Sequence, residues 1–346
     1  MRKLKKVLII RLSSIGDIIL TTPLIRVLNK KYPDCKIDFV IKHQFRDLIA
    51  AHPAVSRLYV YKKNDERYSL KKIRKLIREE RYDIIIDIHK NFRSVYLRTC
   101  ANAGKVVQFK KYAFKRWLLI KFKLNMYDHI VPVYQRYIDS LKDFDIEYDH
   151  KGVDLYIPEH YLNSIDHKWR SIIESIEGPI IGIAPGASYL TKRWMPNGFQ
   201  NVARRLLQQH GDASIIFFGN TDDRRITDSI LAGLHDYSDR IFNMAGELSL
   251  MESAALLNYC SYVITNDTGL MHMATGLKKK VVAIFGSTTR ELGFFPCSND
   301  AAIVQNVYLR CRPCSHVGRH ECPEKHFKCM KDITPDHVIE AFELLR

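Results

Sequence analysis

The chain opens with KKVLIIRLSSIGDIILTTPLIRVLNKK, residues 5–31, and this stretch decides the class of fold. The apolar run Lys6–Leu12 has the length and composition of a buried strand. A tight turn of small residues follows it at Ser13–Asp17. Thr22 is typical of an N-cap and Pro23 of a first helical residue, and they predict a helix that ends near Lys31. A strand, a short turn and a helix in this order predict the first unit of a Rossmann-like α/β domain.

The same alternation of short apolar runs and helical patterns continues along the chain. In the first half it predicts strands at Lys36–Ile41, Arg57–Tyr61 and Asp83–Ile88 and a basic helix at Leu70–Glu80. In the second half it predicts strands at Pro179–Ala184, Ala213–Phe218, Tyr262–Thr265 and Val281–Phe285, and helices at Phe199–His210, Leu250–Asn258 and Leu270–Thr275. Strands that alternate with helices favour two parallel sheets.

The length of 346 residues predicts two domains, because a domain takes about 150 residues. The charge pattern changes near residues 150–160, so we expect an N-terminal domain over 1–157 and a C-terminal domain over 158–346. The last helix packs either within the C-terminal domain or back on the N-terminal domain. No run of about 18 apolar residues is present, so no transmembrane helix is expected. The apolar start is interrupted by Arg11 and Asp17 and lacks a cleavage site, so we expect a cytoplasmic protein without a signal peptide.

The net charge of +16 is concentrated in the first half of the chain. Residues 1–150 hold 33 Lys and Arg against 16 Asp and Glu, whereas the remaining residues hold 21 against 22. This asymmetry indicates a polyanionic partner for the first half: nucleic acid, a phosphorylated substrate or an anionic membrane. A solubilising surface is the simpler alternative.

The eight cysteines include a cluster of four, Cys311, Cys314, Cys322 and Cys329. Four thiols within one loop are able to bind zinc, but the spacing is not that of a standard zinc finger. We favour a packed, reduced, thiol-rich loop over a structural zinc site.

Three turns that follow predicted strands carry candidate chemistry. Asp17 follows Gly16 after the first strand, where a carboxylate is able to act as a general base or merely to cap a helix. The segment 266–272, NDTGLMH, opens a helix whose N–H groups suit a phosphate, or it is a helix cap beside a structural histidine. The segment 185–194, PGASYLTKRW, carries Lys192 and Arg193 as a possible diphosphate clamp, or it is a surface loop over Trp194.

A basic and aromatic run covers Lys105–Lys123. It has seven basic residues, no acidic residue and five interleaved aromatic residues. This composition suits a membrane surface or a phosphorylated amphiphile, and single-stranded nucleic acid would also fit. A solvated helix face would explain the charges but not the aromatic residues.

Several common catalytic patterns are missing from the sequence. It has no GxGxxG fingerprint at the first turn, no P-loop, no HExxH and no GxSxG. Dinucleotide oxidoreductases, P-loop kinases, zinc proteases and serine hydrolases of the usual kinds lose their main support.

Taken together, five ordered segments resemble glycosyltransferase family 9, whose best-known members are the ADP-heptose–lipopolysaccharide heptosyltransferases. They are KVLIIRLSSIGDIILTTPLIRVL, IIIDIHKNFRS, IGIAPGASYLTKRW, FFGNTDD and AGELSLMESAALLNYCSYVITNDTGLMHMA. The cysteine-containing tail is also similar to the tail of many members. The resemblance implies a GT-B fold, in which two Rossmann-like domains face each other across a cleft. It also implies an inverting, metal-independent transfer of heptose from ADP-heptose to the inner core of lipopolysaccharide.

The resemblance also implies roles for individual residues. Asp17 would be the general base, and Lys192 would neutralise the departing diphosphate. The donor would be held by Ser188, Thr191, Asp222, Asp223, Leu248, Asp267, Thr268, Gly269 and His272. The acceptor would be met by Arg11, Ser14, Lys90, Arg93, Arg98, Lys111 and Arg116. Its partners would be an ADP-sugar, an anionic lipid-linked saccharide and the cytoplasmic face of the inner membrane, with no nucleic acid and no required cofactor.

The sequence departs from the family pattern at two places. Met195 stands between Trp194 and Pro196, where many members have Trp-Pro, and His89-Lys90-Asn91 replaces a common His-Gly-Asn. These departures leave open a family member that uses another nucleotide sugar. A non-enzymatic protein that binds membrane or nucleic acid is a further alternative, but it does not explain the motifs of the second half.

Overall fold

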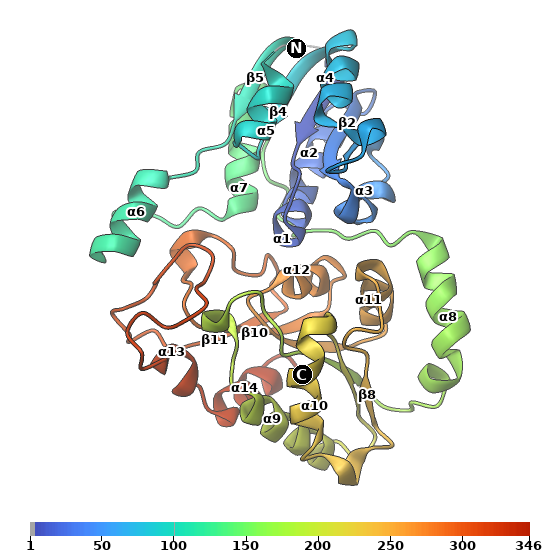
Figure 1. Cartoon of the computed structure of the whole chain (residues 1–346), viewed down its shortest axis with the longest axis vertical. Helices are drawn as coiled ribbons and strands as arrows, with labels where there is room; N and C mark the ends of the chain where they lie inside the picture. The colour runs from blue at the N-terminus through green and yellow to red at the C-terminus, as the bar shows by residue number, and fades with distance from the viewer. Residues whose placement is uncertain (1–3, 100) are drawn as a thin grey trace. The chain divides into compact units, whose positions relative to one another are not determined.

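The computed structural model describes residues 4–99 and 101–346, so Cys100 lies outside the described residues. The chain forms two compact units, whose elements are labelled in Figure 1. The first unit consists of the residues up to Lys111 together with Val131–Pro158. The second consists of Tyr112–Ile130 and Glu159–Arg346.

The first unit is built on a parallel sheet, as the sequence predicts. Over the described residues it has five strands in the order β3-β2-β1-β4-β5. Their bounds are β1 (Lys6–Ile10), β2 (Lys36–Lys42), β3 (Val55–Tyr61), β4 (Arg81–Asp87) and β5 (Asn102–Gln108). The central strand β1 pairs with β2 and β4, and its residues from Val7 to Ile10 are fully buried. This burial on both faces explains why the strand is a continuous apolar run.

The helices of the first unit connect and cover these strands. They are α1 (Ile15–Ile19), α2 (Thr22–Lys31), α3 (Asp47–Ala50), α4 (Leu70–Glu79), α5 (Phe92–Arg98) and α7 (Val133–Ile138). Helix α2 ends at Lys31 as predicted but begins one residue early, with Thr21 in place of Thr22 as its N-cap and proline in its first turn. It buries Leu24, Ile25 and Leu28, and its last turn carries two lysines, which suit the negative end of the helix dipole.

The second unit repeats the architecture with a larger parallel sheet. In the described part of the chain the sheet has six strands in the order β11-β10-β9-β6-β7-β8. Their bounds are β6 (Ile180–Ala184), β7 (Ser214–Phe217), β8 (Ile241–Asn243), β9 (Tyr262–Asn266), β10 (Lys280–Phe285) and β11 (Ala301–Gln305). Ile183, Phe217 and Ile284 from its strands pack in one core with Trp194 and Phe199.

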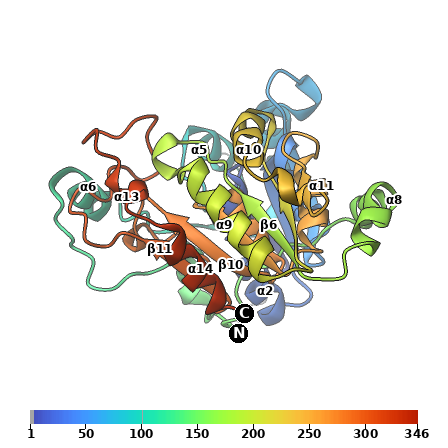
Figure 2. The same ribbon diagram turned by 90° about the horizontal axis from the view of Figure 1, so that it is seen from below.

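The helices of the second unit include one short segment from the first half of the chain. They are α6 (Ala113–Phe122), α8 (Glu159–Glu174), α9 (Pro196–Gln209), α10 (Arg224–Leu231), α11 (Leu250–Leu257), α12 (Gly269–Gly276), α13 (Lys328–Lys331) and α14 (Pro335–Glu343). The last helix, α14, packs beside α9 and on β10 and β11, as Figure 2 shows. It therefore belongs to the second unit and does not return to the first.

The segment Tyr112–Ile130 is the main difference from the domains expected from the sequence. It falls within the predicted N-terminal domain, but it belongs to the second unit. The reason is its contacts: Lys123 Nζ donates to the carbonyl oxygen of Pro313 at 2.8 Å, and Asn125 Nδ2 donates to Glu291 at 3.3 Å. Among the described residues, no helix is both long and apolar enough to cross a membrane.

Candidate active site

In each sheet the strand order changes direction at one place, and the candidate residues follow the strands that meet there. In the first sheet β2 and β3 lie on one side of β1, and β4 and β5 lie on the other. In the second sheet β7 and β8 lie on one side of β6, and β9, β10 and β11 lie on the other. Loops that leave two adjacent strands at such a point diverge and form a ligand-binding crevice. The loops to examine are therefore those after β1 and β4 and those after β6 and β9.

Asp17 lies in α1, directly after β1, and both of its carboxylate oxygens have partners. Oδ1 lies 2.6 Å from Arg11 Nη2 and accepts a hydrogen bond from the hydroxyl of Tyr137 at 3.4 Å. Oδ2 accepts from the hydroxyl of Ser14 at 2.9 Å and from its backbone N–H at 3.3 Å. Arg11 also donates to the carbonyl oxygen of Ile88 at 2.6 Å, so it connects the loop after β1 to the loop after β4.

These contacts decide the charge of Asp17. Burial alone would raise the pKa of its carboxyl, but the charge of Arg11 and the hydrogen bonds from Ser14 outweigh burial and hold the pKa below its ordinary value. The carboxylate is therefore ionised at neutral pH, as a proton acceptor must be. Its side chain keeps 17% of its exposure, so a substrate hydroxyl is able to reach it.

Asp87 is a central residue of the first site that sequence reasoning did not identify. It ends β4, is fully buried, and accepts hydrogen bonds from the backbone N–H groups of His89 at 3.1 Å and Lys90 at 2.8 Å. It also accepts from the hydroxyl of Ser94 at 3.0 Å and from Arg98 Nε at 3.1 Å. Arg98 thus has a partner inside the protein, and its place as an acceptor ligand stays a prediction. The signal for Asp87 was an acidic residue inside an apolar strand.

Two lysines shape the loop after β4. Lys90 has the left-handed φ of 50°, a conformation that favours the glycine common at this place in the family. Lys90 Nζ donates to the carbonyl oxygen of Phe109, and Lys111 Nζ donates to the carbonyl oxygens of His89 and Lys90 at 3.1 and 2.8 Å. Burial, and then the charge of Arg11, lower the pKa of His89 to about 4, so its ring is neutral. The loop therefore presents lysine charges around a neutral histidine.

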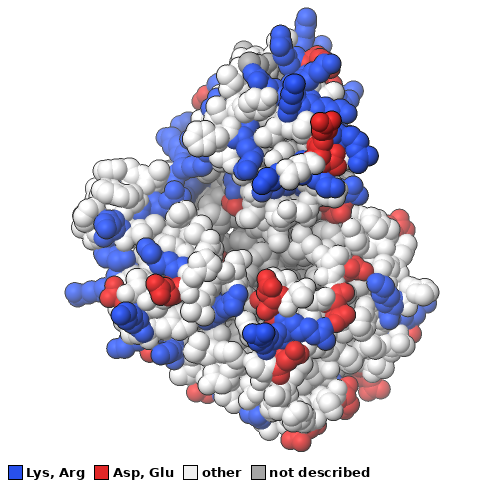
Figure 3. All heavy atoms as spheres, in the orientation of Figure 1, with Lys and Arg blue, Asp and Glu red and all other residues white. Residues whose placement is uncertain are grey.

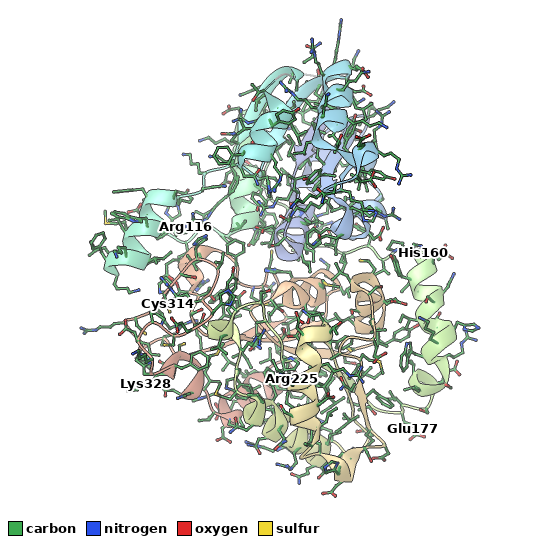
Figure 4. The ribbon with its side chains drawn as sticks, in the orientation of Figure 1. Arg116, His160, Glu177, Arg225, Cys314 and Lys328 are labelled. Atoms are coloured by element: carbon green, nitrogen blue, oxygen red, sulfur yellow. The ribbon has the colours of Figure 1, made fainter. Side chains whose placement is uncertain are left out.

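The predicted acceptor residues do not all meet. Arg11 and Ser14 contact Asp17, and Lys90 and Lys111 lie in the neighbouring loop. Arg93 is exposed on α5. Arg116 lies on α6, and Figure 4 labels it there, so it belongs to the second unit.

In the second unit, Asn266 connects the two loops at the change in strand order. It ends β9 and is fully buried. Its Nδ2 donates to the carbonyl oxygen of Pro185 at 2.7 Å, and its Oδ1 accepts from the backbone N–H of Trp194 at 3.1 Å. Both ends of the 185–194 loop are therefore fixed to β9, a role that its position in the NDTG motif did not reveal.

This arrangement brings Lys192 and Asp267 together, although 75 positions separate them in the numbering. Lys192 Nζ lies 2.8 Å from Asp267 Oδ2, and the hydroxyl of Thr288 donates to the same oxygen at 2.6 Å. Asp267 is 5% exposed and Lys192 16%. Thr288, which follows β10, was not predicted; its signal was the Gly-Ser-Thr-Thr turn after a strand.

Thr268 and Gly269 begin α12 beside this ion pair. Thr268 is the N-cap, and its hydroxyl lies 3.4 Å from that of Thr265. The first N–H groups of a helix lack partners within the helix and attract anions. His272 is buried one turn further along α12. The loop after β6 thus carries Lys192, and the loop after β9 carries the start of α12 and the hydroxyl of Thr268. These groups are suited to binding a diphosphate.

The other predicted donor residues differ in their surroundings. Ser188 and Asp222 are exposed, and Leu248 is half-buried before α11. Thr191 is 1% exposed, and its hydroxyl exchanges hydrogen bonds with the backbone of Arg319, so its place as a donor ligand stays a prediction. Asp223 is buried and accepts from the backbone N–H of Asn220 at 3.1 Å.

Arg312, in the cysteine-rich loop, contacts the turn after β10 that carries Thr288. Arg312 is 8% exposed as a whole residue, and its guanidinium donates to the carbonyl oxygens of Thr288 at 2.7 Å and Gly286, and to Gln305 Oε1 at 3.0 Å. Over the residues that the structure describes, no carboxylate lies within ion-pair distance of it. Arg312 therefore fixes the turn that carries Thr288.

The four clustered cysteines are free thiols. Burial raises the pKa of Cys329 to about 12 and raises that of Cys314, so these thiols stay protonated. Within the described ranges, no three His, Cys, Asp or Glu side chains are arranged to hold a metal ion. The two interpretations of Cys311, Cys314, Cys322 and Cys329, a packed thiol-rich loop and a structural zinc site, therefore stay predictions.

Two Rossmann-like domains, each with a parallel sheet whose strand order changes direction at one place, form a fold of the GT-B class. A family model described as glycosyltransferase family 9 (heptosyltransferase) matches residues 70–327. The chain is 28% identical to lipooligosaccharide heptosyltransferase 2 of Haemophilus ducreyi over 98% of this chain and 99% of that protein. It is 25% identical to lipopolysaccharide heptosyltransferase 2 of Escherichia coli over 98% of each chain.

Solved structures show the same fold. A glycosyl transferase family 9 protein of Veillonella parvula superposes with a TM-score of 0.79 at 23% identity, over 99% of this chain and 97% of that one. An Escherichia coli heptosyltransferase solved with ADP superposes with a TM-score of 0.69 at 18% identity, over 99% and 100% of the two chains. The chain belongs to glycosyltransferase family 9, the heptosyltransferase family, and is a glycosyltransferase.

Proposed function

We propose that this protein transfers heptose from ADP-heptose to the inner core of lipopolysaccharide, with inversion at the anomeric carbon and without a metal ion. The names of its full-length relatives support the donor and the acceptor. The observation that carries the mechanism is the pair of sites: an ionised, accessible Asp17 after β1, and Lys192 with the start of α12 after β6 and β9.

On the acceptor side, the oxygen of the acceptor hydroxyl attacks the anomeric carbon, and Asp17 takes the proton of that hydroxyl. Attack on the face opposite the diphosphate inverts the configuration there. Arg11 and Ser14 hold the carboxylate in place and keep it ionised until the proton arrives. A positioned base of this kind contributes about 10²–10⁴ to the rate.

On the donor side, the bond between the anomeric carbon and the phosphate oxygen breaks, and ADP leaves with the bonding electrons. Lys192 turns from Asp267 to the diphosphate and neutralises the developing charge. Asp267 keeps the hydroxyl of Thr288 as a partner and becomes free to accept a hydrogen bond from a donor hydroxyl. The first N–H groups of α12 add further stabilisation, and each preorganised donor contributes a few kcal/mol, about 3.

These groups replace the usual metal. Lysine and a helix N-terminus stabilise a leaving diphosphate as Mg²⁺ does in other transferases. We therefore propose that no cofactor is needed.

The acceptor places the enzyme at a membrane. Figure 3 shows Lys and Arg crowded over the first unit, in keeping with the excess charge of residues 1–150. An anionic, lipid-linked saccharide is attracted by such a surface. We propose that the protein works in the cytoplasm, peripherally on the inner membrane.

The test is glycosyl transfer from ADP-heptose to heptose-deficient inner-core acceptors, with and without EDTA, for the wild type and Asp17→Ala. Transfer that survives EDTA and is lost in Asp17→Ala is the expected result. Full activity of Asp17→Ala would remove Asp17 from the role of base, and loss of transfer in EDTA would remove the metal-free mechanism.

A second candidate keeps the chemistry and changes the sugar. Lys90, which stands where many members have glycine, and the inserted Met195 both depart from the family pattern in loops next to the sites. The alternative is transfer from another nucleotide sugar to a core or surface polysaccharide. Competition between ADP and UDP for the donor site separates the two candidate functions. ADP should protect the enzyme better than UDP does if the first proposal holds.

A further inference from the structure

Helix α6 and the residues after it form an exposed apolar surface, which we call the α6 surface. It consists of Phe114, Trp117, Phe122, Leu124 and Met126, with exposed fractions of 69%, 52%, 54%, 54% and 54%. Phe114 stacks on Trp117 with 6.0 Å between ring centroids, and Phe122 meets Trp117 edge-on at 5.1 Å. Apolar side chains this exposed and this contiguous mark an interaction site in a soluble domain.

Cationic side chains border the α6 surface. Residues 110–130 contain the cations Lys110, Lys111, Lys115, Arg116, Lys121 and Lys123, and Asp128 as the single acidic residue. Asp128 pairs with Lys115 at 2.9 Å. The remaining excess is positive, and Figure 3 shows uncharged side chains bordered by Lys and Arg at this place, on the left of the view.

The α6 surface is held by the second unit and is not a loose loop. Lys123 Nζ donates to the carbonyl oxygen of Pro313, and Asn125 donates to Glu291. Figures 1 and 2 both show α6 beside the cysteine-rich loop that carries Pro313. On its N-terminal side, α6 is joined through Tyr112 to Lys111, which donates a hydrogen bond to the backbone of the loop after β4. The aromatic side chains are therefore presented from a fixed base, adjacent in the chain to a candidate acceptor residue.

We propose that the α6 surface docks on an anionic lipid bilayer, with Phe114, Trp117 and Phe122 inserted at the headgroup boundary. Tryptophan and phenylalanine favour this boundary, and each lysine or arginine near an anionic surface adds attraction. Another protein would match the apolar side chains, but an excess of six cations over one acidic residue in residues 110–130 is complementary to anionic headgroups. The inference deepens the proposed function, on which it rests for the lipid-linked acceptor, and assigns membrane contact to a segment of the second unit.

The first experiment measures flotation of the full chain with vesicles, without donor or acceptor. One set of vesicles contains equal parts of phosphatidylcholine and phosphatidylglycerol, and the other contains phosphatidylcholine alone. We expect binding to the anionic vesicles, weakened by salt. The variant Phe114→Ser/Trp117→Ser/Phe122→Ser should bind at least about tenfold more weakly. The matched control Val307→Ser/Tyr308→Ser removes exposed side chains elsewhere on the unit, at 64% and 92% exposure, and should bind as the wild type does.

Several outcomes would overturn the proposal. It fails if the triple variant keeps wild-type vesicle binding, or if the control loses as much. It fails equally if sedimentation velocity without vesicles shows a wild-type oligomer that the triple variant dissolves, because the α6 surface is then an interface between copies of the chain. Thermal unfolding checks that the triple variant folds, and its replaced side chains are all more than half exposed.

A second readout locates the contact. Quenching of tryptophan fluorescence by brominated lipids should affect Trp117, whereas Trp194 is buried in the core at 2% exposure. Trp117→Phe should lose the quenching and keep most of the binding, and quenching that persists in this variant contradicts the proposal. Because no transfer is measured, failure of heptose transfer leaves this result standing, and failure of vesicle binding leaves the reaction standing.

Discussion

Replacing Thr288 by valine tests how the donor site controls its lysine. Valine keeps the shape of threonine but removes the hydroxyl that donates to Asp267 Oδ2 at 2.6 Å. Asp267, which is 5% exposed, is then left with Lys192 at 2.8 Å. The negative charge of Asp267 is then stabilised mainly by Lys192, the same residue that must neutralise the diphosphate.

The expected magnitudes follow from these contacts. A hydrogen bond to a charged group contributes about 1.5–3 kcal/mol, so the free energy of unfolding of the second unit should fall by that amount. The attraction of Lys192 for Asp267 across 2.8 Å is about 6 kcal/mol at an effective dielectric constant of about 20, before desolvation is subtracted. Turning Lys192 away from a carboxylate that lacks Thr288 costs more, and ADP should bind about tenfold more weakly.

The assays are urea unfolding followed by tryptophan fluorescence and calorimetric titration with ADP. All three tryptophans, Trp117, Trp169 and Trp194, lie in the second unit, so their fluorescence reports on it. Thr289→Val is the control for stability, because that buried hydroxyl has no hydrogen-bond partner within the described structure. In an Asp267→Asn background, Thr288→Val should cost less than about 0.5 kcal/mol. An equal cost in both backgrounds, or unchanged ADP affinity in Thr288→Val, would refute the reasoning.

Three further predictions concern other buried groups. Asp17→Asn should lower the rate of transfer at least about 10²-fold. It should also lower the free energy of unfolding of the first unit by about 1–3 kcal/mol, because Arg11 loses its ion pair. Turnover and thermal unfolding measure the two effects, and normal turnover would contradict the role of Asp17 as base. Burial lowers the pKa of His52 to about 4, below its ordinary value of 6.5, so the unfolded chain binds more protons between these pH values and stability falls as the pH drops through that window. His52→Phe should flatten this pH dependence of urea unfolding by at most about 3 kcal/mol, and an unchanged slope would exclude His52 as its source. Arg312→Met leaves the carbonyl oxygens of Thr288 and Gly286 without the donor that Arg312 provides. The affinity for ADP should therefore fall, even at temperatures where circular dichroism shows a folded chain. Wild-type affinity for ADP would show that Arg312 does not support the donor site.

The sequence predicted the elements that bury continuous apolar runs. Helix α2 lies within one residue of its predicted bounds, and β1, β4, β6 and β9 lie within two residues of theirs. It missed β5, β8 and β11, all of which are edge strands. In β5 the residues alternate between exposed and half-buried and include a glycine, so they give no apolar run. The basic run Lys105–Lys123 accordingly looked like one feature, although it contains the end of a strand and a helix.

The candidate site was predictable where its residues lie in turns after strands, and not where a role depends on a distant contact. Asp17, Lys192 and Asp267 follow predicted strands directly. Asn266 acts on residues 72 and 81 positions away, and Thr288 acts on one 21 positions away, so no local pattern contains their partners. Thr191 shows the reverse case: it belongs to a motif, but its hydroxyl is occupied by the backbone of Arg319, 128 positions later.

The insertion of Tyr112–Ile130 into the second unit has a consequence for synthesis on the ribosome. The partners of this segment are made late: 190 residues separate Lys123 from Pro313. At about 5–20 residues per second, the nascent chain carries α6 for about 10–40 s before that support exists. The first unit, by contrast, has all its residues once Pro158 has emerged, whereas α6 still lacks the later residues of its own unit. A membrane or a chaperone near the ribosome therefore meets Phe114, Trp117 and Phe122 before the rest of their own unit has been translated.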